Sequence, residues 1–190
     1  MSDEKLEGVA FPAWSKAGAR RRELANVIRS VTRRHEPPVD FGSNLKAGLG
    51  AVWGMSMVAY LAVLTGLPLL LAPLGATAAL LFGQPSSPLS QPVNIMGGYL
   101  IGTIACELAF FAFPGEWVAT AGAVGAAIVV MRALRVTHPP AGALPIVGFN
   151  GMVHGTQLFL VGLLSSVILI ALALVVHRIP PRREYPIGNK

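Results

Sequence analysis

The sequence has little charge outside its two ends and a single cysteine. Of its 190 residues, 53% are hydrophobic and 13% are charged, and residues 47–177 hold only four charged side chains, Glu107, Glu116, Arg132 and Arg135. So little charge excludes an ordinary soluble domain and indicates an integral membrane protein. The single cysteine, Cys106, excludes an internal disulfide and a cysteine-based metal site. We expect it to be a small buried apolar residue.

The motifs of several enzyme classes are also missing. No His-x-x-x-His or Glu-x-x-His pair would place two metal ligands on one helix face, so a metalloenzyme would have to gather Glu107, His138 and His154 from distant segments. No glycine-rich phosphate loop is present, which argues against ATP-driven transport by this chain alone. We therefore expect no enzyme activity, no cofactor and no bound metal.

Basic residues gather at the two ends of the chain. Residues 1–46 carry nine Lys or Arg and six Asp or Glu, and residues 178–190 carry four Lys or Arg and one Glu. The net charge of the whole chain is +6. Lys and Arg favour the cytoplasmic side of a membrane, where they attract anionic lipid. We therefore predict a cytoplasmic N-terminal segment (1–44), a membrane domain (45–177) and a cytoplasmic tail (178–190). The expected location is a bacterial cytoplasmic (inner) membrane, with an anionic inner leaflet rather than nucleic acid as the partner.

Residues 14–34 favour an amphipathic helix. Leu24, Val27, Ile28 and Val31 share one face, and six arginines cover the remainder. That pattern suits a helix lying on the inner leaflet, and the alternative is a solvated basic tail. The Pro-Pro pair after Glu36 is expected to end the helix. The polar start of the chain has no apolar run, so no cleaved signal peptide is expected.

Four apolar segments are long enough to span a bilayer, which takes about 20 residues per helix. They are residues 47–67, 95–113, 117–136 and 156–176. Two shorter apolar segments, 68–83 and 137–150, are interrupted by proline and glycine. The pairs Gly50/Gly54 and Gly98/Gly102 favour close helix packing. The predicted fold is an all-α polytopic membrane protein with four full transmembrane helices and two broken segments, and its packing faces also allow a homo-oligomer.

The second broken segment contains the stretch Thr-His-Pro-Pro-Ala-Gly-Ala at residues 137–143. Proline is tolerated in the first turn of a helix because its missing N–H has no intrahelical partner there. We therefore expect a helix that begins at Pro139 or Pro140, with Thr137 or His138 as its cap. A helix start at membrane depth needs protein, water or a ligand for its free N–H groups.

The two broken segments are similar to each other. Residues 73–82 align with residues 140–149 at an offset of 67, with Pro, Gly, Ala and Phe in the same places. The flanking spans follow nearly the same offset. We therefore predict two units, 45–113 and 117–177, each made of a span, a broken segment and a span. Chance matching of Ala and Gly is the alternative.

Charge placement distinguishes two topologies. If the broken segments only dip into the membrane, the chain crosses four times, and Arg132 and Arg135 lie outside. If both segments cross, the chain crosses six times and all three basic clusters lie inside, as the positive-inside rule favours. The second unit then enters from the opposite side, which makes an inverted repeat like those of secondary transporters. Against this topology, the loop 84–94 would be inside yet carries no Lys or Arg.

The stretch at residues 137–143 resembles the signature of the HPP family of integral membrane proteins. Residues 73–82, Pro-Leu-Gly-Ala-Thr-Ala-Ala-Leu-Leu-Phe, with residues 87–94 and the Gly97-Gly98 pair, resemble another block of the same family. The family is usually described with four transmembrane helices, and its cyanobacterial and chloroplast members are associated with nitrite transport. The resemblance therefore implies a membrane protein that transports a small anion such as nitrite.

The physics of a helix start also suits a small anion. A helix N-terminus offers unpaired N–H groups and about half a unit of positive charge, and glycine lets an ion approach the backbone closely. We predict one anion site near the bilayer midplane, where two helix starts meet, one at Pro73 and one at Pro139 or Pro140. Its residues are Pro73, Gly75, Ala76, Thr77, Thr137, His138, Pro139, Pro140, Ala141, Gly142 and Ala143. The alternative is that the Pro/Gly stretches are packing kinks.

His138 and Glu107 are the candidates for proton coupling. His138 either contacts the anion, changes protonation during transport, or caps the helix backbone. Glu107 lies within a full span, where an acid is a functional candidate by default, and snorkelling or pairing is the alternative. We expect His154, Arg132 and Arg135 at the membrane interface. The alternative function for the whole chain is that of a non-transporting scaffold or regulatory protein.

Overall fold

The structure, a computed structural model, describes residues 13–151 and 153–188. The chain forms two compact units, Met1–Val39 and Asp40–Lys190, which are described separately. The polar start of the chain lies outside the described residues. Within those residues the elements are all helical and no strand occurs, so the predicted all-α class is confirmed.

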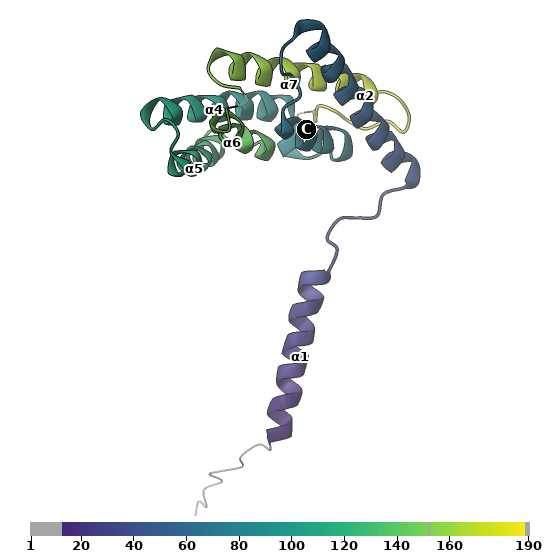
Figure 1. Cartoon of the computed structure of the whole chain (residues 1–190). Coiled ribbons are helices and arrows are strands. Elements are labelled where there is room, and N and C mark those ends of the chain that lie inside the picture. Colours follow the sequence, from purple (N-terminus) through teal and green to yellow (C-terminus); the bar gives the residue numbers. More distant parts are fainter. Residues whose placement is uncertain (1–12, 152, 189–190) are drawn as a thin grey trace, which may run out of the picture. The chain divides into compact units, whose positions relative to one another are not determined.

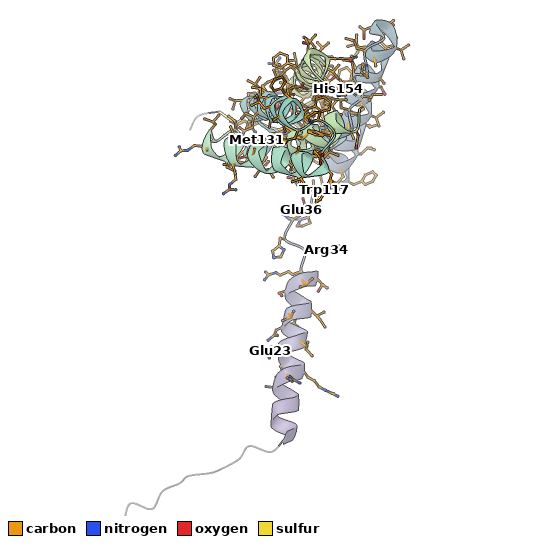
Figure 2. All side chains as sticks on the ribbon, turned by 60° about the vertical axis from the view of Figure 1, so that its left-hand side comes forward. Glu23, Arg34, Glu36, Trp117, Met131 and His154 are labelled. Carbon is orange, nitrogen blue, oxygen red and sulfur yellow. The ribbon has the colours of Figure 1, made fainter. Side chains whose placement is uncertain are left out.

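In the described part of the first unit the chain forms α1 (Ala13–Thr32), which confirms the predicted amphipathic helix to within two residues. The four apolar residues of its predicted face are all exposed, Leu24, Val27, Ile28 and Val31. Figure 2 shows the side chains of Glu23 and Arg34 projecting from this part of the chain. An exposed apolar face on a basic helix suits a membrane surface, and that location stays a prediction.

Three helices of the second unit are long and apolar enough to cross a membrane. They are α2 (Phe41–Thr65), α4 (Pro92–Ala112) and α7 (Thr156–Val176), and they confirm three of the predicted spans (Figure 1). α2 begins earlier than predicted because Asp40 caps it: the Asp40 carboxylate accepts a hydrogen bond from the Ser43 N–H at 2.9 Å.

The fourth predicted span is shorter than expected. α5 covers Trp117–Ala133, 17 residues, rather than residues 117–136. Arg135 has a φ of 58°, a left-handed conformation in which an α-helix does not continue. At 1.5 Å per residue, α5 is about 25 Å long, less than the hydrocarbon core of about 30 Å. The expectation of four full-length helices is therefore wrong for α5.

Both broken segments are short helices that change type partway. In the first, α3 (Ala72–Ala78) continues as the π-helix η1 (Ala79–Gly83), and a single turn, η2 (Pro88–Ser90), follows in the loop. In the second, the 3₁₀-helix η3 (Pro139–Ala143) continues as α6 (Leu144–Phe149). Proline stands in the first turn of α3, η3 and α6, where it removes no helical hydrogen bond. The predicted helix starts are confirmed to within one residue.

The order of helix, broken segment and helix occurs twice in the second unit, with α5 as the shortest of the four helices. The contacts that the first half makes with the second are repeated by the second half with the first. The first helix of each half packs against the last helix of the other, α2 on α7 and α5 on α4. The broken segments do the same, α3 and η1 contacting α7, and η3 and α6 contacting α4. α4 and α7 lie side by side (Figure 1), so each half completes the packing of the other.

The first broken segment runs along α7. The Leu69 carbonyl accepts a hydrogen bond of 3.0 Å from the Ser165 hydroxyl, near the middle of α7. The Leu81 carbonyl lies 2.8 Å from Nε2 of His177, just beyond the end of α7. The segment therefore extends from the middle of α7 to its C-terminal end.

The second broken segment runs along α4 and packs against glycines. A Cβ added at Gly98 would lie 2.6 Å from the Cβ of His138, and one added at Gly102 would overlap a backbone carbonyl of η3. Near the end of α4, the buried Cys106 fills the space beside Gly148. The predicted packing role of the Gly98/Gly102 pair is confirmed.

The start of α2 is joined to the end of α7. Nζ of Lys46 donates hydrogen bonds to the carbonyls of Ile179 and Pro181, both at 2.6 Å. The Arg183 guanidinium donates to the Ser43 hydroxyl at 3.2 Å. The segment after α7 therefore folds across the first turns of α2.

The start of α4 and the end of α5 meet at this same end of the unit. The Asn94 amide donates to the Thr137 carbonyl at 3.1 Å, two residues after Arg135. Burial raises the pKa of Tyr185, so its hydroxyl stays protonated and donates to the Ser90 carbonyl at 3.0 Å. The described basic residues of the second unit gather at this end, namely Lys46, Arg132, Arg135, Arg178, Arg182 and Arg183.

Candidate functional site

A polar cluster lies in the apolar interior of the second unit. Thr77, Tyr99 and His138, from α3, α4 and the start of η3, have no exposed surface. Oγ1 of Thr77 lies 2.9 Å from Nε2 of His138 and 3.0 Å from the Tyr99 hydroxyl. Thr77 and His138 stand 61 residues apart in the sequence. The two broken segments therefore meet at a hydrogen bond between side chains.

Two backbone carbonyls complete the cluster. Nδ1 of His138 faces the Leu89 carbonyl of η2 at 2.8 Å, and Oγ1 of Thr77 lies 3.1 Å from the Pro73 carbonyl, one turn earlier in α3. A carbonyl only accepts, so Nδ1 carries a hydrogen. The rings of Tyr99 and His138 pack with their centroids 5.7 Å apart. Each polar side chain of the cluster has a partner, as burial requires.

The prolines and one glycine position these side chains. Pro73 stands in the first turn of α3, which places Thr77 one turn further on. The residue before a proline is driven into an extended conformation, and His138 has a φ of −135° and a ψ of 97°. Its imidazole therefore contacts α3 and η2 rather than the helix that follows it. Gly98 leaves the space beside α4 that His138 occupies.

The interpretation of His138 as a side-chain cap is wrong. His138 is the residue that precedes η3, but its side chain makes no capping hydrogen bond, because the imidazole is bonded to Thr77 and Leu89. Sequence reasoning also missed Tyr99. A tyrosine inside an apolar span needs a partner for its hydroxyl when it is buried, and that requirement was the available signal.

The remaining predicted site residues divide between the interior and the outer surface. Pro73, Pro140 and Ala141 are buried, Thr137, Gly142 and Ala143 are partly buried, and Gly75, Ala76 and Pro139 are exposed. A Cβ added at Gly75 or at Gly142 would meet no atom. The Ala141 N–H already donates to the His138 carbonyl at 3.1 Å. The structure thus brings Thr77 and His138 together and leaves Gly75 and Ala76 on the outer surface.

Glu107 has a backbone partner away from this cluster. Its Oε1 accepts a 2.7 Å hydrogen bond from the N–H of Gly155, the residue that precedes α7. A carboxylate is favourable at a helix N-terminus, where the backbone N–H groups are unpaired. The pairing that the sequence left as an alternative is therefore present. Coupling by Glu107 stays a prediction.

The other two histidines of the second unit, His154 and His177, lie apart from the cluster. His154 is exposed, as an interfacial residue would be, and its ring lies 5.1 Å from that of Phe110. His177 is buried at the basic end, where Nδ1 has no partner among the described residues. In the described part of the chain no three His, Cys, Asp or Glu side chains approach closely enough to hold a metal ion.

These features define a helical integral membrane protein with a polar cluster between two broken segments. A sequence profile described as HPP, transmembrane region, matches residues 36–186, and the chain therefore belongs to the HPP transmembrane family. Two proteins of Dictyostelium discoideum, each described as a transmembrane protein, are similar to it. One is 33% identical over 126 residues, covering 62% of this chain and 44% of the relative.

The second relative is 32% identical over 126 residues, covering 62% of this chain and 40% of its own length. The chain thus spans less than half the length of these curated relatives. No solved structure matches the chain with significance. The comparisons therefore establish the family and the membrane location, and they name no substrate.

Proposed function

We propose that this chain is a membrane transporter for a small monovalent inorganic anion, with nitrite as the first substrate to test. The observation that carries the proposal is the buried hydrogen bond between Thr77 and His138, which joins the two broken segments. Polar side chains are costly inside a membrane protein, and there they mark substrate pathways. The resemblance to a family with nitrite-transporting members supports the choice of nitrite.

The chemistry of the cluster suits weak binding of an anion. The hydroxyls of Thr77 and Tyr99 and the imidazole of His138 offer hydrogen-bond donors, and no Lys or Arg belongs to the cluster. Binding without a fixed opposite charge permits release as well as entry. The anion binds beside the Thr77–His138 pair, with the backbone of residues 73–77 and 137–143 on either side.

The path of the chain supports six crossings. The first broken segment runs from the middle of α7 to its end, where α2 begins. The second runs along α4 from Gly98, which contacts His138, to Phe110 in the last turn, which contacts Phe149. On this reading both segments cross, and the basic residues of all three clusters face the cytoplasm, as the positive-inside rule favours. Both chain termini are then cytoplasmic, in the inner membrane of a bacterium.

An inverted repeat follows from that topology. The two halves have the same order of elements and exchange equivalent contacts. In transporters built this way, broken helices line a site that opens to each side in turn. Because Thr77, Tyr99 and His138 have no exposed surface, we assign this conformation to a closed stage of a carrier rather than to an open channel. The outer faces of the bundle also allow a homo-oligomer.

Uptake into liposomes tests the proposal. Purified protein is reconstituted, and uptake of nitrite, nitrate, formate and chloride is compared with that of protein-free liposomes. We expect saturable nitrite uptake that falls at least tenfold in His138→Ala, because the anion loses a donor worth about 1–3 kcal/mol. Arg132→Gln, at an exposed position away from the cluster, is the matched control. Absence of uptake of all four anions by folded wild-type protein would favour the scaffold function.

A further inference from the structure

Thr77 is surrounded by more hydrogen-bond partners than its one hydrogen can serve. Its Oγ1 lies within 3.1 Å of the Pro73 carbonyl, of Nε2 of His138 and of the Tyr99 hydroxyl. A threonine hydroxyl donates one hydrogen bond and accepts two. The Tyr99 hydroxyl makes no other hydrogen bond to the described residues, so we orient its hydrogen toward Oγ1 of Thr77. The Thr77 hydrogen therefore points either to Nε2 of His138 or to the carbonyl of Pro73.

These two positions correspond to two protonation states of His138. When the imidazole is neutral, Nδ1 donates to Leu89 and Nε2 accepts the hydrogen of Thr77. When the imidazole is protonated, Nε2 donates to Oγ1 of Thr77, which turns its own hydrogen to the Pro73 carbonyl. In both states every N–H and O–H of the cluster has an acceptor. A proton is therefore taken up without leaving a buried donor unpaired, which would cost free energy.

We propose that the Thr77 hydroxyl is a two-position switch that lets His138 take up one proton together with each transported anion, so that transport is electroneutral symport. This inference rests on the proposed function and adds the coupling ion and the stoichiometry. The substrate class becomes the conjugate bases of weak acids, which release and recover a proton readily. Nitrite and formate belong to this class, and chloride does not.

No described residue around His138 carries a charge that would balance an imidazolium. α3 contributes Thr77, α4 contributes Tyr99, and η2 contributes the Leu89 carbonyl, all of them neutral. Tyr99 is the titratable group among them. α5 and α6 also pack against η3; α6 carries no titratable side chain, and Arg132 of α5 is exposed. A buried charge needs a partner, and the anion itself supplies it.

The proton step balances without a further reactant. The O–H bond of the weak acid breaks as its proton joins Oγ1 of Thr77, and the hydrogen that Thr77 held passes to Nε2 of His138, where an N–H bond forms. The new hydrogen on Oγ1 turns to the Pro73 carbonyl, and the conjugate base stays beside the imidazolium. Release on the other side reverses the step. The net movement is one proton and one monovalent anion, with no net charge transferred across the membrane.

Separate control of pH and voltage tests the coupling in wild-type proteoliposomes. Valinomycin with chosen potassium concentrations sets the voltage, and the trapped buffer sets the internal pH. At zero voltage, a pH one unit higher inside is expected to accumulate nitrite about tenfold, because one proton moves with each anion. A voltage of about 60 mV, positive inside, is expected to cause no accumulation, whereas an anion uniporter would give about tenfold.

A trapped pH dye measures the stoichiometry in the same vesicles. We expect one proton to enter per nitrite, after subtraction of the leak of nitrous acid into protein-free liposomes. Accumulation that follows voltage and ignores the pH gradient would overturn the symport inference and leave the proposed anion transport standing. Absence of saturable uptake under both gradients would overturn both.

Variants of Thr77 test the switch itself. Thr77→Val keeps the shape of the side chain and removes the hydroxyl. In this variant we expect the pH gradient to cause no accumulation of nitrite. Thr77→Ser keeps the hydroxyl and should restore it. Thr65→Val is the matched control, because Thr65 makes the same bond to a carbonyl one turn back, at the exposed end of α2. If Thr77→Val still accumulates nitrite tenfold, the switch is wrong; if it fails to insert, the wild-type stoichiometry still decides the coupling.

Discussion

Gly98 and His138 are in such close contact that Gly98 has no room for a side chain. A Cβ at Gly98 would lie 2.6 Å from the Cβ of His138. The backbone of α4 at Gly98 therefore packs directly against His138 of the cluster. This contact explains why a helix in the middle of the bundle carries glycine, which otherwise weakens a helix.

The first prediction concerns this contact. Gly98→Ala should destabilise the protein by about 1–3 kcal/mol, because the added methyl group forces His138 or α4 to move. Thermal unfolding in mild detergent measures the change. Gly122→Ala is the control: Gly122 is also helical, and a Cβ there meets no atom, so that variant should match or exceed the wild type. Equal stability of the two variants would contradict the packing argument.

The second prediction concerns topology. With six crossings, a cysteine in place of Glu116 faces the outside, and one in place of Ser86 faces the cytoplasm. Both side chains are exposed, and the native Cys106 is buried. We expect an impermeant thiol reagent to label Glu116→Cys in intact cells, and Ser86→Cys only after permeabilisation. The opposite pattern would contradict six crossings with cytoplasmic termini.

The third prediction concerns the stability of the polar cluster. Thr77→Val leaves both Nε2 of His138 and the Tyr99 hydroxyl without their partner, and should cost about 1–3 kcal/mol. Tyr99→Phe leaves Thr77 with its other partners and should cost about 0.5–1.5 kcal/mol. The double variant should lose less than the sum, since both changes break one shared hydrogen bond. Strict additivity in detergent unfolding would show that the hydroxyls do not interact.

The fourth prediction concerns the backbone donors of the two helix starts. Gly75→Val and Gly142→Val should both insert and fold as the wild type does, because a Cβ at either glycine meets no atom. Their unfolding temperatures and gel-filtration profiles check this expectation. The backbone-donor version of the site then requires that both variants lose nitrite uptake. Normal uptake by the folded double variant would confine the site to the side chains of Thr77, Tyr99 and His138.

The fifth prediction concerns Glu107. Glu107→Ala frees the Gly155 N–H at the start of α7 and should cost about 0.5–2 kcal/mol, the usual loss for a helix cap. Glu107→Gln keeps an acceptor oxygen and should stay close to the wild type. Hydrogen exchange at the first turn of α7 measures both. If Glu107 also couples protons, Glu107→Gln must change the pH dependence of uptake, and an unchanged dependence removes that role.

The sequence by itself determined the class of protein and much of its order. Charge confined to the ends and apolar runs of about 20 residues are sufficient for a helical membrane protein, because hydrocarbon excludes both charge and unpaired backbone. Prolines located the starts of α3 and η3, since proline is tolerated only in the first turn. The length of α5 escaped prediction because composition does not reveal the left-handed Arg135 that follows it.

Only the tertiary structure decided which polar residues meet. Neither Thr77 nor His138 stands out from its own segment, and the residues around each of them give no sign of a hydrogen bond that joins positions 61 residues apart. Their contact depends on α4 and α7 packing side by side, and on Gly98 leaving space for an imidazole. The same packing brought Glu107 to Gly155 and left Gly75 on the outer surface. Long-range packing of this kind follows from the combined shape of several helices, which no single stretch of sequence contains.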